Sequence, residues 1–219
     1  MARNKYPDQT VEKILDVAFG LFCSKGYDNT SISDIVAGLD GLTKGAIYHH
    51  FDSKEAILDA AFERAMAPIA QARRAVREDR GYNGAQKLRD IVSPESVVPQ
   101  VELWQRMGLL NDPIANARIL ATEYRDSLRV SARSFLQPLI EEGIADGSIV
   151  CPHPREAAEA LSLLVNLWLI PLFDQEAMRD DMLARGNVLV DMASALGIDL
   201  GRNNVHATIE AVADILHRK

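Results

Sequence analysis

Apolar residues recur at helical spacing along almost all of this 219-residue chain, and no stretch shows the apolar–polar alternation of a β-strand. The first such stretch runs from Val11 to Phe22, with Thr10 as its expected N-cap and Lys25-Gly26 at its end. Further helices are expected over residues 31–38, 43–51, 53–79, 85–92, 95–110, 113–146, 155–173, 175–196 and 203–217. The pattern predicts an all-α fold.

Local signals mark where several of these helices begin or bend. Ser31 with Asp34, and Asp52 with Glu55, each have the spacing of a capping box, in which two side chains satisfy free amides at a helix start. Pro68 lies inside the helix expected over residues 53–79 and removes one backbone hydrogen bond there. It is either a bend that shapes packing or a hinge between two parts of the chain.

The two short helices expected over residues 31–38 and 43–51 have the form of a helix-turn-helix. Gly41 lies in the turn between them, and Thr43 offers a hydroxyl cap to the second helix. That second helix is too polar to be core, since it presents Lys44, Tyr48, His49 and His50. In a helix-turn-helix the second helix enters the major groove of DNA. A protein that binds double-stranded DNA is the first hypothesis.

The charge of the chain argues mildly against this hypothesis. The net charge is −7, and residues 1–65 alone hold seven Lys/Arg and ten Asp/Glu, which gives −3. DNA binding needs only a local positive footprint, here Arg3, Lys5, Lys44 and Lys54, helped by helix N-termini that point at phosphates. With so few cations to displace counterions, we expect a shallow dependence of affinity on salt.

Composition favours a soluble intracellular protein. Hydrophobic residues make up 47% and charged residues 25%, and the longest apolar stretch, residues 160–173, is too short and too polar to span a bilayer. Met1 to Lys5 are not followed by the apolar region of a signal peptide. Cys23 and Cys151 are far apart in sequence, which favours a reduced, cytoplasmic setting and no membrane association.

Residues 13–62 resemble the N-terminal domain of the tetracycline-repressor (TetR) family of bacterial regulators. The matching residues follow the family's order with nearly its spacing: Ile14-Leu15-Asp16-Val17-Ala18, Phe22, Lys25-Gly26-Tyr27, Thr30-Ser31-Ile32, Asp34-Ile35, Gly45, Tyr48, His50-Phe51 and Lys54-Glu55. The run from Val36 to Thr43 is one residue longer than is usual, with Gly-Leu-Asp-Gly at the turn and Leu39 and Leu42 at its apolar sites. Beyond residue 65 the resemblance is one of length and helical layout.

Residue types at the second helix suggest how it meets DNA. Thr43 offers a hydroxyl, Lys44 can donate to guanine, Gly45 permits close approach of the backbone and Ala46 can touch a thymine methyl group. The resemblance implies phosphate contacts by Tyr48 and His49. Lys54, at the start of the fourth helix, and Ser31 or Ser33 are expected at further phosphates.

Other residues of this region have simpler roles. Phe22, Ile47 and Phe51 are expected in the core, His50 is expected to face inward, and Tyr27 is expected to pack. Arg3 and Lys5 are either an arm that reaches the minor groove or a solvated tail.

We expect a domain boundary inside the fourth helix, with a DNA-binding domain over residues 1–63 and a helical effector-binding and dimerisation domain over residues 64–219. Pro113 suits the first turn of the helix that follows it. The segment 156–173 is apolar on nearly all sides, so one face is expected to pack on the body and the other on a twofold mate. The last helix adds an apolar stripe that the resemblance assigns to a homodimer interface: Val205, Ile209, Val212 and Leu216.

The resemblance also implies a small molecule bound among the body helices, and no other cofactor. The candidates are aromatic residues, a flexible methionine and polar residues on otherwise apolar faces: Trp104, Met107, Tyr124, Arg125, Asn166, Trp168 and Phe173. Each of them is alternatively ordinary core or surface. Asn166 lies within an apolar run, and its partner is either a ligand or the mate's Asn166. Arg125 either serves the ligand or pairs with Glu123 or Asp126.

The function that these features favour is a transcriptional repressor that binds a near-palindromic operator as a homodimer and is released by a small-molecule effector. Repression is the family's usual mode, so an activator or a ligand-independent regulator remains an alternative. An enzyme or metal protein is a remote alternative, because no HExxH, paired-cysteine spacing or Gly-rich phosphate loop is present. Cys151 and His153 alone are too few ligands for zinc.

Overall fold

The computed structural model describes residues 7–110, 112–114, 116–170 and 179–216, and every regular element within these ranges is a helix, as predicted. The helices of the N-terminal part are α1 (Pro7–Lys25), α2 (Ile32–Ala37), α3 (Lys44–His50) and α4 (Lys54–Glu78). Those of the C-terminal part are α5 (Gly84–Ile91), α6 (Pro94–Arg106), α7 (Ala117–Asp126), η1 (Ser127–Leu136), α8 (Gln137–Asp146), α9 (Pro154–Leu163), η2 (Leu164–Trp168), α10 (Arg179–Ala195) and α11 (Arg202–Leu216).

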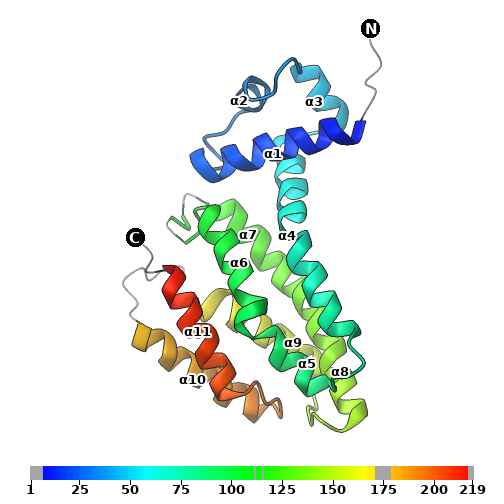
Figure 1. Cartoon of the computed structure of the whole chain (residues 1–219), viewed down its shortest axis with the longest axis vertical. Helices are drawn as coiled ribbons and strands as arrows, with labels where there is room; N and C mark the ends of the chain where they lie inside the picture. Colours follow the sequence, from blue (N-terminus) through cyan, green and yellow to red (C-terminus); the bar gives the residue numbers. More distant parts are fainter. Residues whose placement is uncertain (1–6, 111, 115, 171–178, 217–219) are drawn as a thin grey trace.

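Helices α1 to α3 and the start of α4 form a small head above a larger helical body (Figure 1). The core of the head is built from apolar side chains of all four helices, including Ile14, Phe22, Ile35, Ile47 and Ile57, which are at most 1% exposed. Burial of this apolar surface is what holds helices as short as α2 and α3, since such helices are unstable in isolation.

The structure corrects two of the expected helix starts in the head. Helix α1 begins at Pro7, so Thr10 lies inside the helix and is not its cap. Helix α4 is capped by Ser53, whose Oγ accepts from the amide of Ala56 at 3.1 Å, and not by Asp52. The capping box of Ser31 and Asp34 is confirmed, with both reciprocal hydrogen bonds present.

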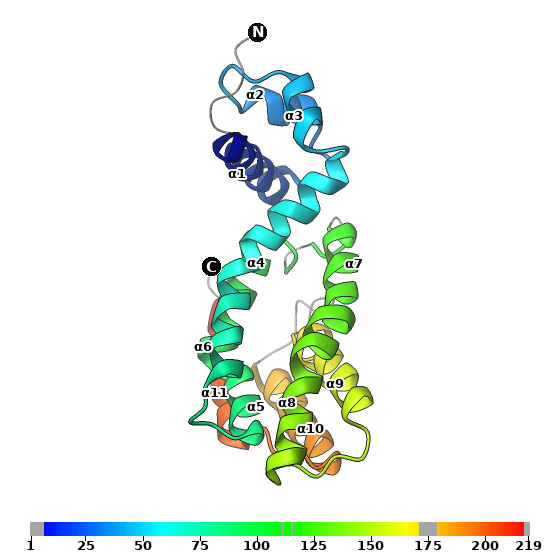
Figure 2. The same ribbon diagram turned by 90° about the vertical axis from the view of Figure 1, so that its right-hand side faces the viewer.

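Helix α4 links the two parts as one continuous element of 25 residues, with Pro68 inside it. Figure 2 shows it descending from the head along the body, with α6 and α5 beside its lower half. A change in the packing of the lower half of α4 therefore acts on the same continuous helix that supports the head.

The body contains a long helical rod in which the middle section is π-helical. Helices α7, η1 and α8 follow one another without a break from Ala117 to Asp146. The predicted start at Pro113 is wrong, because Pro113 lies in a turn and Asn116 precedes the first helical residue. Segment η2 continues α9 in the same π-helical way, and π-helical turns often occur at functional sites.

The structure also corrects the expected dimer stripe of the last helix. Helix α11 packs against α6 and α10, and Val205, Ile209 and Val212 are at most 3% exposed within a single chain. Gly186 of α10 permits this packing, because a Cβ there would lie 2.1 Å from the Cδ1 of Ile209. Val205, Ile209 and Val212 are therefore core of one protomer, whereas Leu216, the last residue of the expected stripe, is half-buried.

Other features bear on the class of protein. Both cysteines are free. In the ranges that the structure describes, the helices are too short or too polar to cross a bilayer. Phe173, Arg3, Lys5 and the first part of the helix expected over residues 175–196 lie outside the described residues.

Candidate nucleic-acid interface and body cavity

Helix α3 presents a polar face outward and a single apolar anchor inward. Thr43 caps it, with Oγ1 accepting from the amide of Ala46 at 3.3 Å, while Ile47 is fully buried. The residues on the outer face are Lys44, Gly45, Tyr48 and His49, all exposed, and Ala46 is half-buried. Tyr48 is 46% exposed, a large value for an aromatic ring, and its centroid lies 6.0 Å from the Nζ of Lys44.

The turn before α3 packs within the head. Gly38 ends α2 so close to α1 that a Cβ would lie 2.6 Å from the Cγ1 of Val17. Leu39 is buried, Leu42 is half-buried and Gly41 has a φ of +77°, which favours glycine. The two leucines thus fill the apolar sites as expected, and the glycine absorbs the change of direction.

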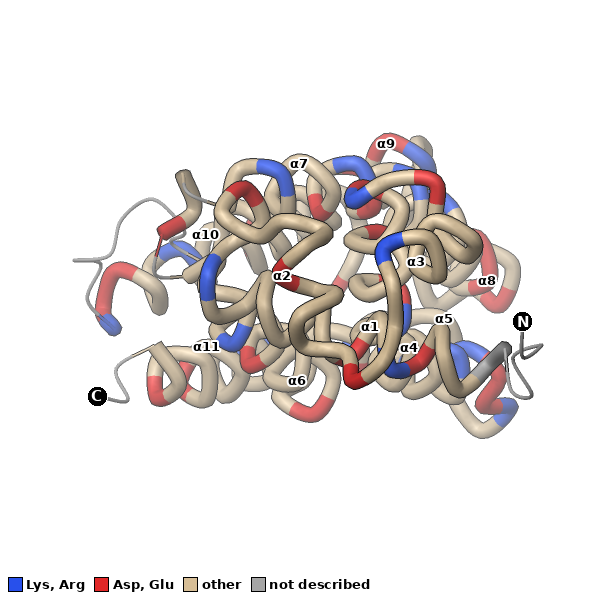
Figure 3. Tube along the Cα trace, turned by 90° about the horizontal axis from the view of Figure 1, so that it is seen from above, with Lys and Arg blue, Asp and Glu red and all other residues tan. Residues whose placement is uncertain are grey.

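The serines expected near DNA differ in their local bonds. Ser31 and Ser33 are both exposed, but the hydroxyl of Ser31 is already engaged with Asp34 at 2.6 Å. Lys25 also pairs with Asp34 at 2.9 Å, and together these donors hold the pKa of Asp34 well below its usual range. Seen from the head end, basic and acidic residues are intermixed (Figure 3). Lys25 is therefore partly neutralised, which makes Lys44 the more available cation.

The side chain of Lys54, for which a phosphate contact is expected, turns inward. Its Nζ donates to the carbonyl oxygens of Tyr27 and Thr30, both at 2.9 Å, and lies 4.1 Å from the centroid of the Tyr27 ring. Tyr27 is buried and packs against Phe22, as expected. Two of the three ammonium donors are thus used inside the head, where they tie the loop after α1 to the start of α4.

Replacing Lys54 by methionine is expected to lower the free energy of unfolding by about 2 kcal/mol, because two carbonyls lose a charged donor while the apolar stem is kept. Chemical denaturation measures the change. Lys44→Met serves as the control and should have almost no effect, since Lys44 is exposed. Equal stabilities of the two variants would show that the inward bonds of Lys54 contribute nothing to the head.

Arginines of α7 reach the head from the body. The guanidinium of Arg118 lies 5.4 Å from the ring centroid of Tyr27, and its Nη2 is 3.2 Å from Glu55. Arg125 pairs with Asp126 at 2.9 Å and approaches Asp59 of α4 at 3.9 Å. The pairs with Glu55 and Asp59 connect α7 to α4, but they are well exposed and contribute little stability.

A narrow cavity of about 40 Å³ lies inside the body. Its walls are mostly apolar and come from α4, α5, α6, η1, α9 and η2, together with the start of the segment after η2 and the loop before α11. Of the predicted pocket residues, Trp104 and Asn166 line it. Ligand pockets are usually about 300–1,000 Å³, so a ligand of ordinary size requires these walls to separate.

The other predicted pocket residues lie elsewhere. Tyr124 and Arg125 are exposed on α7, and Met107 is buried away from the cavity lining. Trp168 is half-buried, and its backbone oxygen accepts from the Nη1 of Arg185 at 2.9 Å. These four residues are therefore not part of the cavity lining.

A chain of hydrogen bonds through the buried polar residues crosses the cavity wall. Gln100 accepts from the Nη2 of Arg73 at 2.5 Å and donates to Glu123 at 3.1 Å and to Asn166 at 3.4 Å. Asn166 in turn donates to the hydroxyls of Ser127 and Ser162, both at 3.3 Å. Asn166 thus has partners within its own chain. Sequence reasoning missed Gln100, because its place on the buried face of α6 becomes apparent only in the structure.

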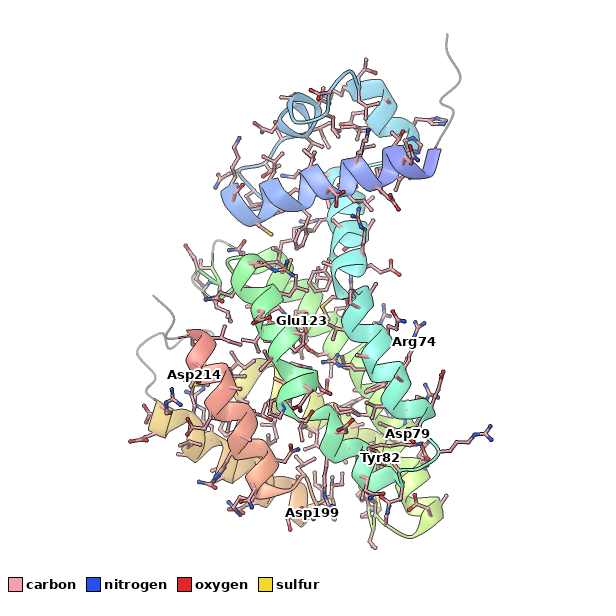
Figure 4. All side chains as sticks on the ribbon, in the orientation of Figure 1. Arg74, Asp79, Tyr82, Glu123, Asp199 and Asp214 are labelled. Carbon is pink, nitrogen blue, oxygen red and sulfur yellow. The ribbon has the colours of Figure 1, made fainter. Side chains whose placement is uncertain are left out.

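Burial of the Glu123 carboxyl group raises its pKa to about 7, and the nearby positive charge of Arg73 offsets part of that rise. The indole of Trp104 also lowers the pKa of Glu123 slightly, although its N–H does not reach hydrogen-bond geometry with any acceptor among the described residues. Burial likewise lowers the pKa of Arg73. In Figure 4 Glu123 lies among the body helices, whereas Arg74 projects outward from α4.

This shift predicts a pH-dependent stability. The folded state keeps the proton on Glu123 between about pH 4.5 and 7, where the unfolded chain has released it, so stability falls as the pH rises through this window. Urea unfolding at pH 5 and at pH 8 measures the change. Between these two pH values the free energy of unfolding of wild type should fall by about 3 kcal/mol more than that of Glu123→Gln. Parallel pH profiles for the two proteins would mean that Glu123 ionises normally.

The N-terminal region matches the family model described as bacterial regulatory proteins of the tetR family, over residues 14–61. The biofilm operon negative transcriptional regulator IcaR of Staphylococcus aureus is 44% identical over 48 residues, which cover 22% of this chain and only 25% of that protein. The transcriptional repressor KstR2 of Rhodococcus jostii is 27% identical over 141 residues, covering 62% of this chain and 66% of that one.

The likeness in fold extends over the body. A solved complex of SmeT with triclosan superposes with a TM-score of 0.62 at 23% identity and covers 89% of this chain and 94% of that chain. The head match, the sequence relatives and the shared all-helical fold agree with one another. The head of the chain, residues 14–61, matches the tetR family of bacterial regulatory proteins, and the chain has the all-helical fold seen in SmeT.

Proposed function

We propose that this protein is a transcriptional repressor that binds an operator in double-stranded DNA and releases it when a small molecule occupies the body. The observation that carries the proposal is the outward face of α3, a polar surface with an exposed tyrosine and lysine held by one buried isoleucine. Nothing in the packing of the head requires Lys44 or Tyr48 to be there, so their exposure favours a role in binding. IcaR and KstR2 are both named as negative regulators or repressors, which supports this direction of control.

The proposed DNA contacts follow from this exposure. Lys44 and Ala46 would meet base edges, and Thr43 and Gly45 would lie close to the DNA backbone. Tyr48, His49 and Ser33 would contact phosphates. Lys54, by contrast, is proposed to position the start of α4, with at most one N–H left for a phosphate. Ser31 is proposed to act through the capping of α2.

The proposed release follows from the size of the cavity. A ligand that fits only after the walls separate binds the protein with a widened cavity and not the protein with a narrow one. Because of this difference in affinity, the ligand shifts the population toward the widened form. Arg73 of α4 lines the cavity, so widening it displaces the helix that supports the head. Helix α7 offers a second connection, because it holds Glu123 near the cavity and Arg118 against Tyr27.

We also propose a homodimer and a functional boundary near residues 63 and 64, inside α4. Two heads are needed to reach two half-sites about one DNA turn apart. With Val205, Ile209 and Val212 of α11 buried, the apolar surface left for a mate includes Val188 and Met192 on α10, which are exposed, and the half-buried leucines of α9 and η2. Sedimentation that gives a monomer at micromolar concentration would contradict the homodimer.

Selection of bound fragments from total genomic DNA tests the proposed function. Wild-type protein should enrich a small set of fragments that share a near-palindromic sequence, and an excess of nonspecific DNA should not remove them. Enrichment that is spread evenly over the genome, or absent at low salt, would contradict an operator-binding repressor.

A further inference from the structure

The polar groups that line the body cavity are unequally satisfied. Gln100, Asn166 and Ser162 are bonded to one another or to Ser127, as described above. Among the described residues, the Nε of Arg73 and the Nε1 of Trp104 have no acceptor, although both atoms are buried. Trp104 is fully buried as a residue. Both unsatisfied groups are therefore N–H donors at the polar edge of one apolar cavity.

A buried donor without a partner is unfavourable, and it becomes favourable only when an acceptor meets it. The amide oxygens of Gln100 and Asn166 in the cavity wall are already engaged, since they accept from Arg73 and Gln100, and neither meets the two unsatisfied donors. The missing chemical group is therefore an oxygen acceptor. A ligand that brings oxygen acceptors to both donors gains two hydrogen bonds.

The charge at this edge is positive. Arg73 has no carboxylate within ion-pair distance among the described residues, because Gln100 lies between it and Glu123. Burial and the raised pKa of Glu123 leave that carboxyl group partly protonated at neutral pH. The remaining walls are apolar, with Leu88, Val101, Phe135 and Leu161 among them. An anionic oxygen acceptor with an apolar body matches this distribution.

We propose that the effector is an apolar molecule with a single carboxylate head, which accepts from the Nε of Arg73 and the Nε1 of Trp104. This inference rests on the proposed function only for the consequence of binding, and the binding itself can be measured without DNA. The apolar body of the ligand would separate η1 and the α9–η2 helix from α6, because the cavity of about 40 Å³ holds little more than the head group.

The two tryptophans of the chain allow a direct test. In the Trp168→Phe protein, Trp104 is the sole indole and reports on the cavity by its fluorescence. Octanoate, octanol and octylammonium share one apolar tail and differ in the head group, and each is added below its solubility limit and, for the two ions, below the micellar concentration. Octanoate is expected to bind at least about tenfold more tightly than octanol, the difference expected for a charge-assisted hydrogen bond. Octylammonium is expected to bind most weakly.

Calorimetric titration of variants then assigns the contacts. Arg73→Gln and Trp104→Phe should each weaken octanoate binding about tenfold or more and leave octanol binding nearly unchanged. Arg74→Gln and Trp168→Phe are the matched controls, since Arg74 is exposed and Trp168 is outside the cavity lining, and both should bind octanoate as wild type does. Arg73→Lys keeps the charge without the Nε and should recover part of the affinity, and thermal unfolding identifies any variant that is not folded.

Failure of this inference is distinct from failure of the proposed function. Equal binding of octanoate and octanol, tighter binding of octylammonium, or no binding of octanoate to folded protein would each overturn the carboxylate assignment, whether or not the protein binds DNA. Octanoate binding that depends on Arg73 and Trp104 would support it even if no operator were found.

Discussion

Replacing Lys44 and Tyr48 together by alanine is expected to lower operator affinity about 100-fold, since each lost base or phosphate contact is worth about 1–3 kcal/mol. Both side chains are exposed on α3, so the free energy of unfolding should change by less than about 0.5 kcal/mol. Fluorescence anisotropy with a labelled operator fragment, beside circular dichroism, measures both quantities.

Arg74→Ala/Tyr82→Ala is the matched control for that double variant. It also removes one cation and one exposed tyrosine, but from α4 and the loop below it, far from α3 (Figure 4). Its operator affinity should equal that of wild type. If the two double variants lose the same affinity, the loss reflects overall charge, and α3 is not the recognition element.

The Gly84→Ala substitution is expected to destabilise the body by at least about 3 kcal/mol. A Cβ at Gly84 would lie 2.3 Å from the amide nitrogen and 2.4 Å from the Cα of Gly143, so α5 and α8 would have to separate. That separation would also break the bond from the Gly84 amide to Asp146, which is 2.8 Å long. Thermal and urea unfolding measure the loss.

Gly20→Ala tests the same chemical change where there is room for it. Gly20 lies within α1, is exposed, and would have no atom within 4 Å of an added Cβ. Alanine is the better helix former by about 1 kcal/mol, so this variant should be slightly more stable than wild type. If Gly84→Ala were equally harmless, the close approach of α5 and α8 would not be a constraint on the fold.

The helical class and the head were predictable because their signals are local. The capping box of Ser31, the hydroxyl cap of Thr43 and the glycine of the turn act within a few residues, so the sequence pattern contains them directly. Even there the start of α4 was placed one residue early, because Asp52 and Ser53 are both good caps and only the backbone decides between them.

The cavity was only half predictable because its residues meet from distant parts of the chain. Trp104 and Asn166 stood out by residue type, but Arg73 on an otherwise polar helix and Gln100 in an ordinary position gave no comparable signal. Their roles depend on how α4, α6, η1 and η2 pack. The same limit explains the α11 stripe, since an apolar face does not reveal whether its own chain or a mate covers it.

Hydroxyl-radical footprinting of an operator fragment with wild-type protein tests the central claim most directly. A dimer whose two α3 helices enter the major groove should protect two patches about one helical turn apart on one face of the duplex. The Lys44→Ala/Tyr48→Ala protein should remove both patches at the same concentration. A single patch, protection without a defined position, or patches that persist in the double variant would contradict the account.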